Sequence, residues 1–356
     1  MEEFLICGIQ QIGVGVPDLA REVQWCSRTL GIDVRIFEEE GEAALMLPYT
    51  GGVPQERRAL LAVNLQGGAG LEIWQYTKRT PRRPGFIVQP GDLGICCARI
   101  KARDPLAARA RMGTAGVPDL GPARTDPSGD PTFFLRDPLG LAFQVVRGRD
   151  WFVSGRSPTG GVSGCMIGVS RMEKSLRFYQ EILGYDRIVY DREGQFTDLQ
   201  DMAAGGAHLR RVLIENTAPL QGAFSPLLGS SRLELVQVLD RAPRRVFADR
   251  FWGDIGFIHL CFDVRGMDAL KRRCETEGFP FTVDSGGSFS MGSAAGRFAY
   301  AEDPDGTLIE FVETYRLDIV KKWGLQIDLR GRKPEKPLSR WMLRAMGLNR
   351  IRHPHH

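Results

Sequence analysis

Hydrophobic and polar residues follow one another in short blocks that predict strands and helices in a fixed order. Residues 257–262 alternate in the way of a strand with one buried face. Residues 172–183 carry apolar side chains at helical spacing, and Gly184 follows as a helix terminator. Further strands are predicted at 166–169, 210–214, 233–239, 298–301 and 307–312, with a second helix at 267–276. This order is a βαβββ unit, and the whole chain holds four such units.

The units belong to an internal duplication. Residues 71–94 read LEIWQYTKRTPRRPGFIVQPGDLG and residues 233–256 read LELVQVLDRAPRRVFADRFWGDIG, so LE, Gln, Arg, PRR and GD-x-G recur at one offset. Leu30-Gly31 matches Leu183-Gly184 upstream. The sequence therefore predicts two similar halves, near 8–147 and 162–315.

Composition and cysteine spacing restrict the class of protein. Of the 356 residues, 43% are hydrophobic and 25% are charged, which excludes general disorder and a collagen-like fibre. The N-terminus lacks a cleavable signal pattern, and no apolar run reaches the roughly 18 residues of a membrane-spanning helix. The seven cysteines are scattered without a C-x-x-C pair, which argues against a disulfide framework or a zinc ribbon. We predict a soluble cytoplasmic protein.

Positive charge is concentrated at the C-terminal end. The net charge is +4, but residues 316–356 hold eleven Lys and Arg against three acids, so the rest of the chain is slightly acidic and no nucleic-acid partner is expected. Leu338, Trp341, Met342 and Ala345 fall at helical spacing, which predicts a basic amphipathic helix. This helix could dock on an acidic partner or a membrane surface, but a brace against the remaining chain is favoured because Trp and Met would otherwise be exposed. The terminal His-Pro-His-His is too short to be a native metal site.

Two segments connect this pattern with a known superfamily. Residues 169–184, VSRMEKSLRFYQEILG, follow a first strand, and residues 302–311, EDPDGTLIEF, form a last strand. A tandem βαβββ chain with these segments resembles the vicinal oxygen chelate superfamily of glyoxalases, epimerases, extradiol dioxygenases and bleomycin-resistance proteins. The resemblance covers nearly all of 8–315. It implies an α+β fold in which four βαβββ modules form two incomplete β-barrels, here with a C-terminal helical extension.

The resemblance also implies a domain organisation. Two units form one barrel, and its concave face holds a divalent metal that chelates two adjacent oxygens of the substrate. We expect an N-terminal barrel over 1–150 without metal and a linker over 151–161. A C-terminal barrel with the metal site is expected over 162–315, followed by the basic extension over 316–356.

In this superfamily, metal ligands occupy up to four equivalent positions, on the first and last strands of each unit of a barrel. For the C-terminal barrel these positions are Gly164, Glu234, His259 and Glu310. For the N-terminal barrel they are Gln11, Glu72, Cys97 and Gln144. The C-terminal set holds three competent ligands, so we expect the metal there.

The residue types support part of this assignment. Alternation sends His259 to the face opposite the apolar residues of its strand, and Glu310 lies between two apolar neighbours. A neutral imidazole with carboxylates suits Fe, Mn, Zn, Ni or Co, although a hydrogen-bonded core histidine and an ion-paired edge carboxylate would give the same pattern. Glu234 is expected as the third ligand or as a general base. Glu234 could also be a structural residue kept by the duplication, since its repeat partner Glu72 lies among poor ligands.

Some residues limit the chemistry. A non-haem iron oxygenase needs two histidines and a carboxylate, and Gly164 stands at one expected histidine position. His208 is the only other histidine outside the C-terminal tail, and it is not at a ligand position of the superfamily. Cys97 and Cys261 are interpreted as small buried residues. The twin Pro-Arg-Arg segments are interpreted as braces between units rather than as anion sites.

The leading hypothesis is an enzyme that binds one divalent metal through His259, Glu310 and Glu234 and acts on a small substrate with adjacent oxygens. The metal would stabilise an enediolate or enolate, which gives isomerase, epimerase or lyase chemistry. A ring-cleaving extradiol dioxygenase is one alternative, and a metal-free small-molecule binding or resistance protein is another. A homodimer is left open.

Overall fold

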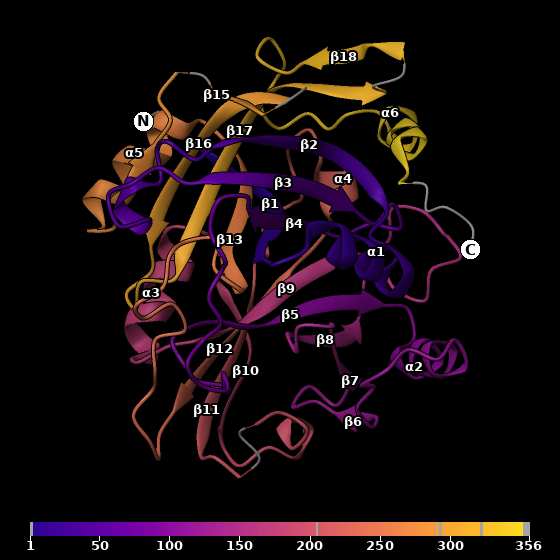
Figure 1. Cartoon of the computed structure of the whole chain (residues 1–356), viewed down its shortest axis with the longest axis vertical. Helices are drawn as coiled ribbons and strands as arrows, with labels where there is room; N and C mark the ends of the chain where they lie inside the picture. Colours follow the sequence, from indigo (N-terminus) through magenta and orange to yellow (C-terminus); the bar gives the residue numbers. More distant parts are fainter. Residues whose placement is uncertain (1–2, 204–205, 288, 292–293, 321–322, 352–356) are drawn as a thin grey trace.

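The computed structural model describes residues 3–203, 206–287, 289–291, 294–320 and 323–351. The chain forms a mixed α+β fold of two curved sheets with helices packed outside them (Figure 1). We call the ten-stranded sheet, which holds the first and last strands of the chain, sheet A, and the eight-stranded sheet, sheet B. The terminal histidines of the expected tail, His353, His355 and His356, lie outside the described residues. In the described part of the chain, no helix is both long and apolar enough to cross a membrane.

Sheet A runs in the order β14-β16-β17-β13-β1-β4-β3-β2, with β15 paired to β16 and β18 paired to β17. Its strands are β1 (Leu5–Gly15), β2 (Val34–Glu42), β3 (Glu56–Val63), β4 (Gly70–Tyr76), β13 (Gly256–Arg265), β14 (Val283–Asp284), β15 (Phe289–Met291), β16 (Ala294–Glu302), β17 (Leu308–Val320) and β18 (Leu325–Asp328). The four central strands β17, β13, β1 and β4 are thus the last and first strands of two units.

Sheet B runs in the order β10-β11-β12-β9-β5-β8-β7-β6. Its strands are β5 (Gly94–Ala102), β6 (Arg124–Thr125), β7 (Pro131–Arg136), β8 (Ala142–Arg147), β9 (Val162–Gly168), β10 (Arg187–Gly194), β11 (Leu209–Glu215) and β12 (Arg232–Val238). Its central strands β12, β9, β5 and β8 repeat the arrangement of sheet A.

One long helix follows the first strand of each unit. These helices are α1 (Leu19–Leu30), α2 (Pro105–Thr114), α3 (Met172–Glu181) and α5 (Met267–Thr276). The Asp18 side chain caps α1 by accepting a hydrogen bond from the Arg21 amide, and Gly31 ends it with a φ of 61°. Shorter helices are α4 (Ser225–Leu228), α6 (Arg340–Ala345), η1 (Leu47–Tyr49), η2 (Thr197–Leu199) and η4 (Met346–Asn349). Helices α3 and α5 lie at the segments 172–183 and 267–276, where the periodicity of the sequence predicts them.

The sheets do not follow the two halves of the sequence. Sheet A combines the first unit with the fourth, and sheet B combines the second with the third. The junctions are the antiparallel pairs β1–β13 and β5–β9. The expectation of one barrel over 1–150 and another over 162–315 is therefore corrected. Backbone hydrogen bonds join the strands, and these do not depend on which half supplies the partner.

The connections between sheets carry the twin Pro-Arg-Arg segments. Residues 77–93 lead from β4 in sheet A to β5 in sheet B, and residues 239–255 lead from β12 back to β13. Asp92 on the first connection pairs with Arg241 at 2.6 Å and Arg244 at 3.2 Å on the second. Reciprocally, Arg79 pairs with Asp254 at 2.7 Å. These contacts agree with the interpretation of the segments as braces.

The C-terminal extension packs on sheet A through a different face from the expected one. Leu338, Leu343 and Met346 are buried, at 2%, 0% and 3% exposure, in a cluster with residues of β2 and β3. Trp341 is 63% exposed, so its expected burial is wrong. The helix α6 has only six residues, and its inward face is set by Leu343 together with Met346 in the following turn. The extension acts as a brace, as expected, but Trp341 does not contribute to it.

Candidate metal centre

Four side chains from the four central strands of sheet A converge. Gln11 lies on β1, Glu72 on β4, His259 on β13 and Glu310 on β17, and each is at most 7% exposed. His259 Nε2 lies 3.3 Å from Glu72 Oε2 and 3.1 Å from Glu310 Oε2. The amide nitrogen of Gln11 donates to the same two carboxylate oxygens, at 3.3 and 3.4 Å. One imidazole, two carboxylates and one amide thus surround a common point.

A glycine makes this convergence sterically feasible. Gly13 on β1 pairs with His259 on one side and with Glu72 on the other. A Cβ atom at position 13 would lie 2.3 Å from His259 Cε1 and 2.7 Å from both ring nitrogens. The imidazole therefore occupies the space above Gly13 that any other residue would fill, and through it reaches Glu72.

Aromatic side chains hold the imidazole in place. The ring of Trp252 stacks nearly parallel to that of His259, with centroids 6.5 Å apart and 13° between the planes. The Tyr300 ring meets His259 edge-on at 5.5 Å, and its hydroxyl lies 3.5 Å from Nδ1. The remaining nitrogen, Nε2, is thereby directed at the carboxylates.

The charges of the cluster are strongly coupled. Burial by itself opposes protonation of His259, but Glu310 and Glu72 outweigh it and raise the pKa of the imidazole to about 9. Burial opposes ionisation of Glu310 as well, and the nearby His259 outweighs it and lowers the pKa of that carboxyl. The pairing therefore favours an imidazolium ion at His259 beside an ionised Glu310 carboxylate.

The donor set fits a divalent cation. One ligand atom each from Glu72, His259 and Glu310 lies within 4.8 Å of the other two. Gln11 Oε1 is buried without a hydrogen-bond partner among the described residues, and His259 Nε2 is buried and faces the two carboxylates. Buried polar atoms without partners are rare in native proteins, and a cation at the common point would give one to Gln11 Oε1. Nitrogen and carboxylate donors suit Zn, Mn, Fe, Co or Ni.

The comparison with protein families agrees with this geometry. Residues 161–311 match the family model of the Glyoxalase/Bleomycin resistance protein/Dioxygenase superfamily. These residues belong to the glyoxalase superfamily. The resemblance carried by 169–184 and 302–311 is confirmed, and the internal repeat extends the same unit to the first half of the chain. No curated protein matches the sequence at a significant level.

Two solved structures share the fold over most of the chain. Glyoxalase I from Zea mays is 12% identical with a TM-score of 0.53, and the match covers 86% of this chain and 92% of that one. A proposed dioxygenase from Bacillus subtilis is 13% identical with a TM-score of 0.56, over 86% of this chain and 85% of that one. At these identities the likeness shows the fold alone.

The structure brings together two of the three expected metal ligands. His259 and Glu310 lie side by side, whereas Glu234 lies on β12 in sheet B and cannot join them. Glu72 stands in its place, with Gln11 as a fourth donor. Both occupy superfamily positions in the sequence, and only the pairing of the first unit with the fourth brings them to His259. The expectation of Glu234 as a ligand is therefore corrected.

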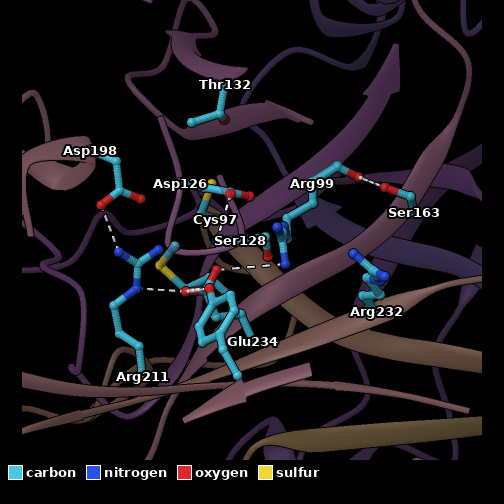
Figure 2. Close-up of polar contacts among 12 residues, drawn as sticks. Cys97, Arg99, Asp126, Ser128, Thr132, Ser163, Asp198, Arg211, Arg232 and Glu234 are labelled. Carbon is cyan, nitrogen blue, oxygen red and sulfur yellow. Dashed lines mark hydrogen bonds and ion pairs between the residues drawn. The ribbon is translucent and has the colours of Figure 1, made fainter. Parts of the chain in front are cut away.

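Arginine and tyrosine side chains surround Glu234 instead. Arg211 Nε donates to Glu234 Oε1 at 2.6 Å, and the Tyr190 hydroxyl donates to the same oxygen at 2.7 Å (Figure 2). Arg99 Nη1 lies 3.6 Å from Oε2, and Arg211 also binds Asp198 at 2.7 Å. Burial opposes ionisation of Glu234, but Arg211 and Arg99 outweigh it and lower the pKa of the carboxyl. Glu234 is thus an ionised partner of arginines in sheet B, in the other sheet from His259 and Glu310.

Among the residues that the structure describes, sheet B offers no group of donors that fits a metal. Its four equivalent positions are Cys97, Gln144, Gly164 and Glu234, with a single carboxylate. Met166 pairs with both Cys97 and Glu234, so it stands where Gly13 makes room in sheet A. Burial raises the pKa of the Cys97 thiol, which disfavours a thiolate ligand.

The positions of His208 and of the cysteines bear on whether these residues could bind a metal or react. The His208 side chain is 44% exposed, and its Nε2 pairs with Glu193 at 3.0 Å. His208 directly precedes β11 in sheet B, whereas His259 lies on β13 in sheet A. All seven cysteines are buried and unbridged. Burial raises the pKa of Cys261 well above its usual value. These residues support the interpretation of structural thiols.

Two cavities meet at the converging carboxylates. The first, of about 870 Å³ including its open mouth, is bounded by Gln11, Glu72 and Glu310 and otherwise mainly by apolar side chains. These apolar residues are Ile36, Phe37, Leu61, Val63, Phe224, Leu227, Leu228, Val312, Leu317 and Met346. The second cavity, of about 490 Å³, lies against Arg57, Trp74, Trp252 and Tyr300 and reaches the same two carboxylates. A small molecule in either cavity would contact the donor set.

Proposed function

We propose that this protein is an enzyme that binds one divalent cation through Gln11, Glu72, His259 and Glu310. Its substrate would be a small molecule with two adjacent oxygens, converted by isomerase, epimerase or lyase chemistry through an enediolate or enolate. The observation that carries this proposal is the convergence of His259 Nε2 on Oε2 of Glu72 and Glu310 at 3.3 and 3.1 Å, beside a substrate-sized cavity. The fold shared with Zea mays glyoxalase I supports it.

The chain offers both the ligands and a group for proton transfer. A bound divalent cation would supply Lewis-acid stabilisation of a developing enolate oxygen. Glu310 has a side chain 9% exposed and Glu72 one that is 3% exposed, so Glu310 is the more accessible carboxylate at the cavities. We assign to Glu310 the removal of a proton from the carbon beside the carbonyl and its return to the neighbouring carbon. The other three ligands, Gln11, Glu72 and His259, would hold the cation.

The apolar cavity indicates the remainder of the substrate. Arg297 is the basic residue among the residues that line it, and this side chain is already paired with Asp284 at 2.8 Å and Asp268 at 2.6 Å. A highly charged substituent would therefore lose its hydration here without gaining a free partner. The cavity favours an uncharged aliphatic or aromatic substituent next to the two oxygens.

The alternative functions are weaker on specific grounds. An extradiol dioxygenase of the two-histidine, one-carboxylate type needs a second imidazole, and His259 is the one histidine of the described cluster. A metal-free binding protein would use the same apolar cavity. It would not explain why two carboxylates and an imidazole converge in a buried position. Metal content separates this alternative from an enzyme.

The repeat supplies a matched pair of variants for that measurement. Glu72 and Glu234 occupy equivalent positions in sheets A and B. We expect about one equivalent of Zn, Mn, Fe, Co or Ni in untagged protein by elemental analysis. Glu72→Gln should lower that content, and Glu234→Gln should leave it unchanged in folded protein. Equal metal loss in both variants, or no metal in protein never exposed to chelator, would refute the assignment.

The reaction class can be tested without knowing the product. Small 2-oxoaldehydes and α-hydroxyketones, alone and as thiol adducts, are incubated with the metal-loaded protein in D₂O and followed by ¹H NMR. We expect deuterium incorporation at the carbon next to the carbonyl, abolished in Glu310→Gln, which conserves the shape of the side chain. Oxygen consumption with catechols and no exchange with carbonyl compounds would instead establish the dioxygenase alternative.

A further inference from the structure

Sheet B carries three inward arginines where sheet A carries small residues. By strand register, Arg99 stands opposite Gln144 as Cys261 stands opposite Glu310. Arg232 pairs with Gly164 as Gly70 pairs with Gln11. Arg211 likewise corresponds to Ala59, since each lies two residues before the partner of the glutamate on the next strand. The face that holds the metal donors in sheet A is thus strongly basic in sheet B.

Arg211 is the most completely paired of these arginines. Arg211 is completely buried and binds both Glu234 and Asp198, at 2.6 and 2.7 Å. Arg99 is 3% exposed, but its one ionic contact is the 3.6 Å approach to Glu234, which Arg211 already neutralises. Arg99 Nε and Nη1 have no hydrogen-bond partner in the described part of the chain. An incompletely paired buried guanidinium is costly unless something else binds it.

Arg99 borders a cavity of about 750 Å³, counting its open mouth. Arg232 and Arg149 border the same cavity, and Figure 2 shows the Arg99 guanidinium between Glu234 and Arg232. Arg232 uses Nε to bind Glu215 at 2.6 Å, while its buried Nη2 has no partner among the residues described. Arg149 is exposed and forms no ion pair with a described residue. Three guanidinium groups therefore present free N–H donors to one space.

Of the acids that line this cavity, Glu215 is the partner of Arg232, and the three aspartates have other partners. Asp130 pairs with Arg147 at 3.0 Å, and Asp150 pairs with Lys101 at 3.1 Å. Asp126 accepts hydrogen bonds from the backbone amides of Ser128 and Asp130, at 2.8 and 3.1 Å. Burial, together with the charges of Arg149, Arg99 and Arg187, lowers the pKa of Arg232 to about 10, as expected where cations crowd together.

We propose that this cavity of sheet B is a second binding site, specific for a small anion whose carboxylate or phosphate group is bound by Arg99, Arg232 and Arg149. Guanidinium groups present paired N–H donors that match both oxyanions. The duplication has thus given one sheet a cation site and the other an anion site.

The test measures binding of inorganic phosphate and of succinate by calorimetry, with the full chain. We expect saturable binding of at least one of them, weakened about tenfold or more in Arg99→Gln, the scale of one lost charge-assisted bond. Arg149→Gln, which alters an exposed side chain and leaves the core intact, should weaken the same binding by a smaller factor. Preference for phosphate or for succinate distinguishes the two oxyanion classes.

Matched controls exclude general effects. Arg28→Gln removes an exposed arginine on α1, away from the cavity, and should leave anion binding unchanged. His259→Gln should reduce metal content without changing anion affinity, because His259 belongs to sheet A. The proposal is overturned if the parent protein binds neither anion. It is also overturned if Arg99→Gln and Arg149→Gln both bind the anion with the affinity of the parent protein. Should Arg99→Gln fail to fold, Arg149→Gln alone decides.

Discussion

Replacing Gly13 by alanine would test the geometry of the metal centre with a single methyl group. The new Cβ would lie 2.3 Å from His259 Cε1, whereas carbon atoms in contact are normally about 3.5–4.0 Å apart. The imidazole would have to move by more than about 1 Å. Trp252 and Tyr300 pack on its other sides, so the ring cannot withdraw while Nε2 keeps its direction. We therefore expect Gly13→Ala to displace the imidazole from Glu72 and Glu310.

Two quantities should change. Overpacking of this kind costs about 1–3 kcal/mol of unfolding free energy, which should lower the melting temperature of the metal-free protein by several degrees. Metal affinity should fall about 10–100-fold, the scale found when the support of a ligating histidine is removed. Both are measured on purified protein, by denaturant unfolding with chelator and by competition with a metal-binding dye.

The control and the double variant sharpen the result. Gly85→Ala adds the same methyl group where no atom lies within 4 Å, so it should change neither quantity. Because Gly13→Ala acts through His259, its effect on metal affinity should largely vanish in a His259→Gln background. A Gly13→Ala protein that binds metal with the parent affinity would refute the assignment of His259 as a ligand held over Gly13.

Three further outcomes are expected. Burial raises the pKa of Asp263 to about 7, although Arg265 opposes this. An acid with a raised pKa in the folded state stabilises the fold at low pH and loses that contribution as the pH rises from about 4 to 7. Asp263→Asn should therefore stabilise the protein more at pH 8 than at pH 4, as measured by denaturant unfolding. Leu343→Ala should cost about 2–5 kcal/mol because Leu343 is fully buried, while Trp341→Ala should cost less than about 0.5 kcal/mol; equal losses would show that α6 packs differently. His259→Ala should lower the metal content found by elemental analysis, and Cys97→Ala at the equivalent position of sheet B should not. The reverse result would show that the metal binds in sheet B and not in sheet A.

Most local features could be predicted from the sequence. The apolar periodicity and terminating glycines located α3 and α5, because an exposed helix must bury one stripe of side chains. The internal repeat identified four equivalent units and the position of His259 and Glu310 on their strands. The orientation of α6 could not be predicted in the same way, because several faces of a short helix are apolar and its packing on sheet A chooses among them.

The sequence by itself determined the βαβββ units, their number and the eight strand positions from which donors could come, since these depend on periodicity and on the repeat. Only the tertiary structure decided which units share a sheet. Strands pair through backbone hydrogen bonds that all units offer alike, and the connections 77–93 and 239–255 are long enough to reach either partner. By joining β1 to β13 and β5 to β9, the fold placed Gln11 and Glu72 beside His259 and Glu310, and Glu234 among arginines.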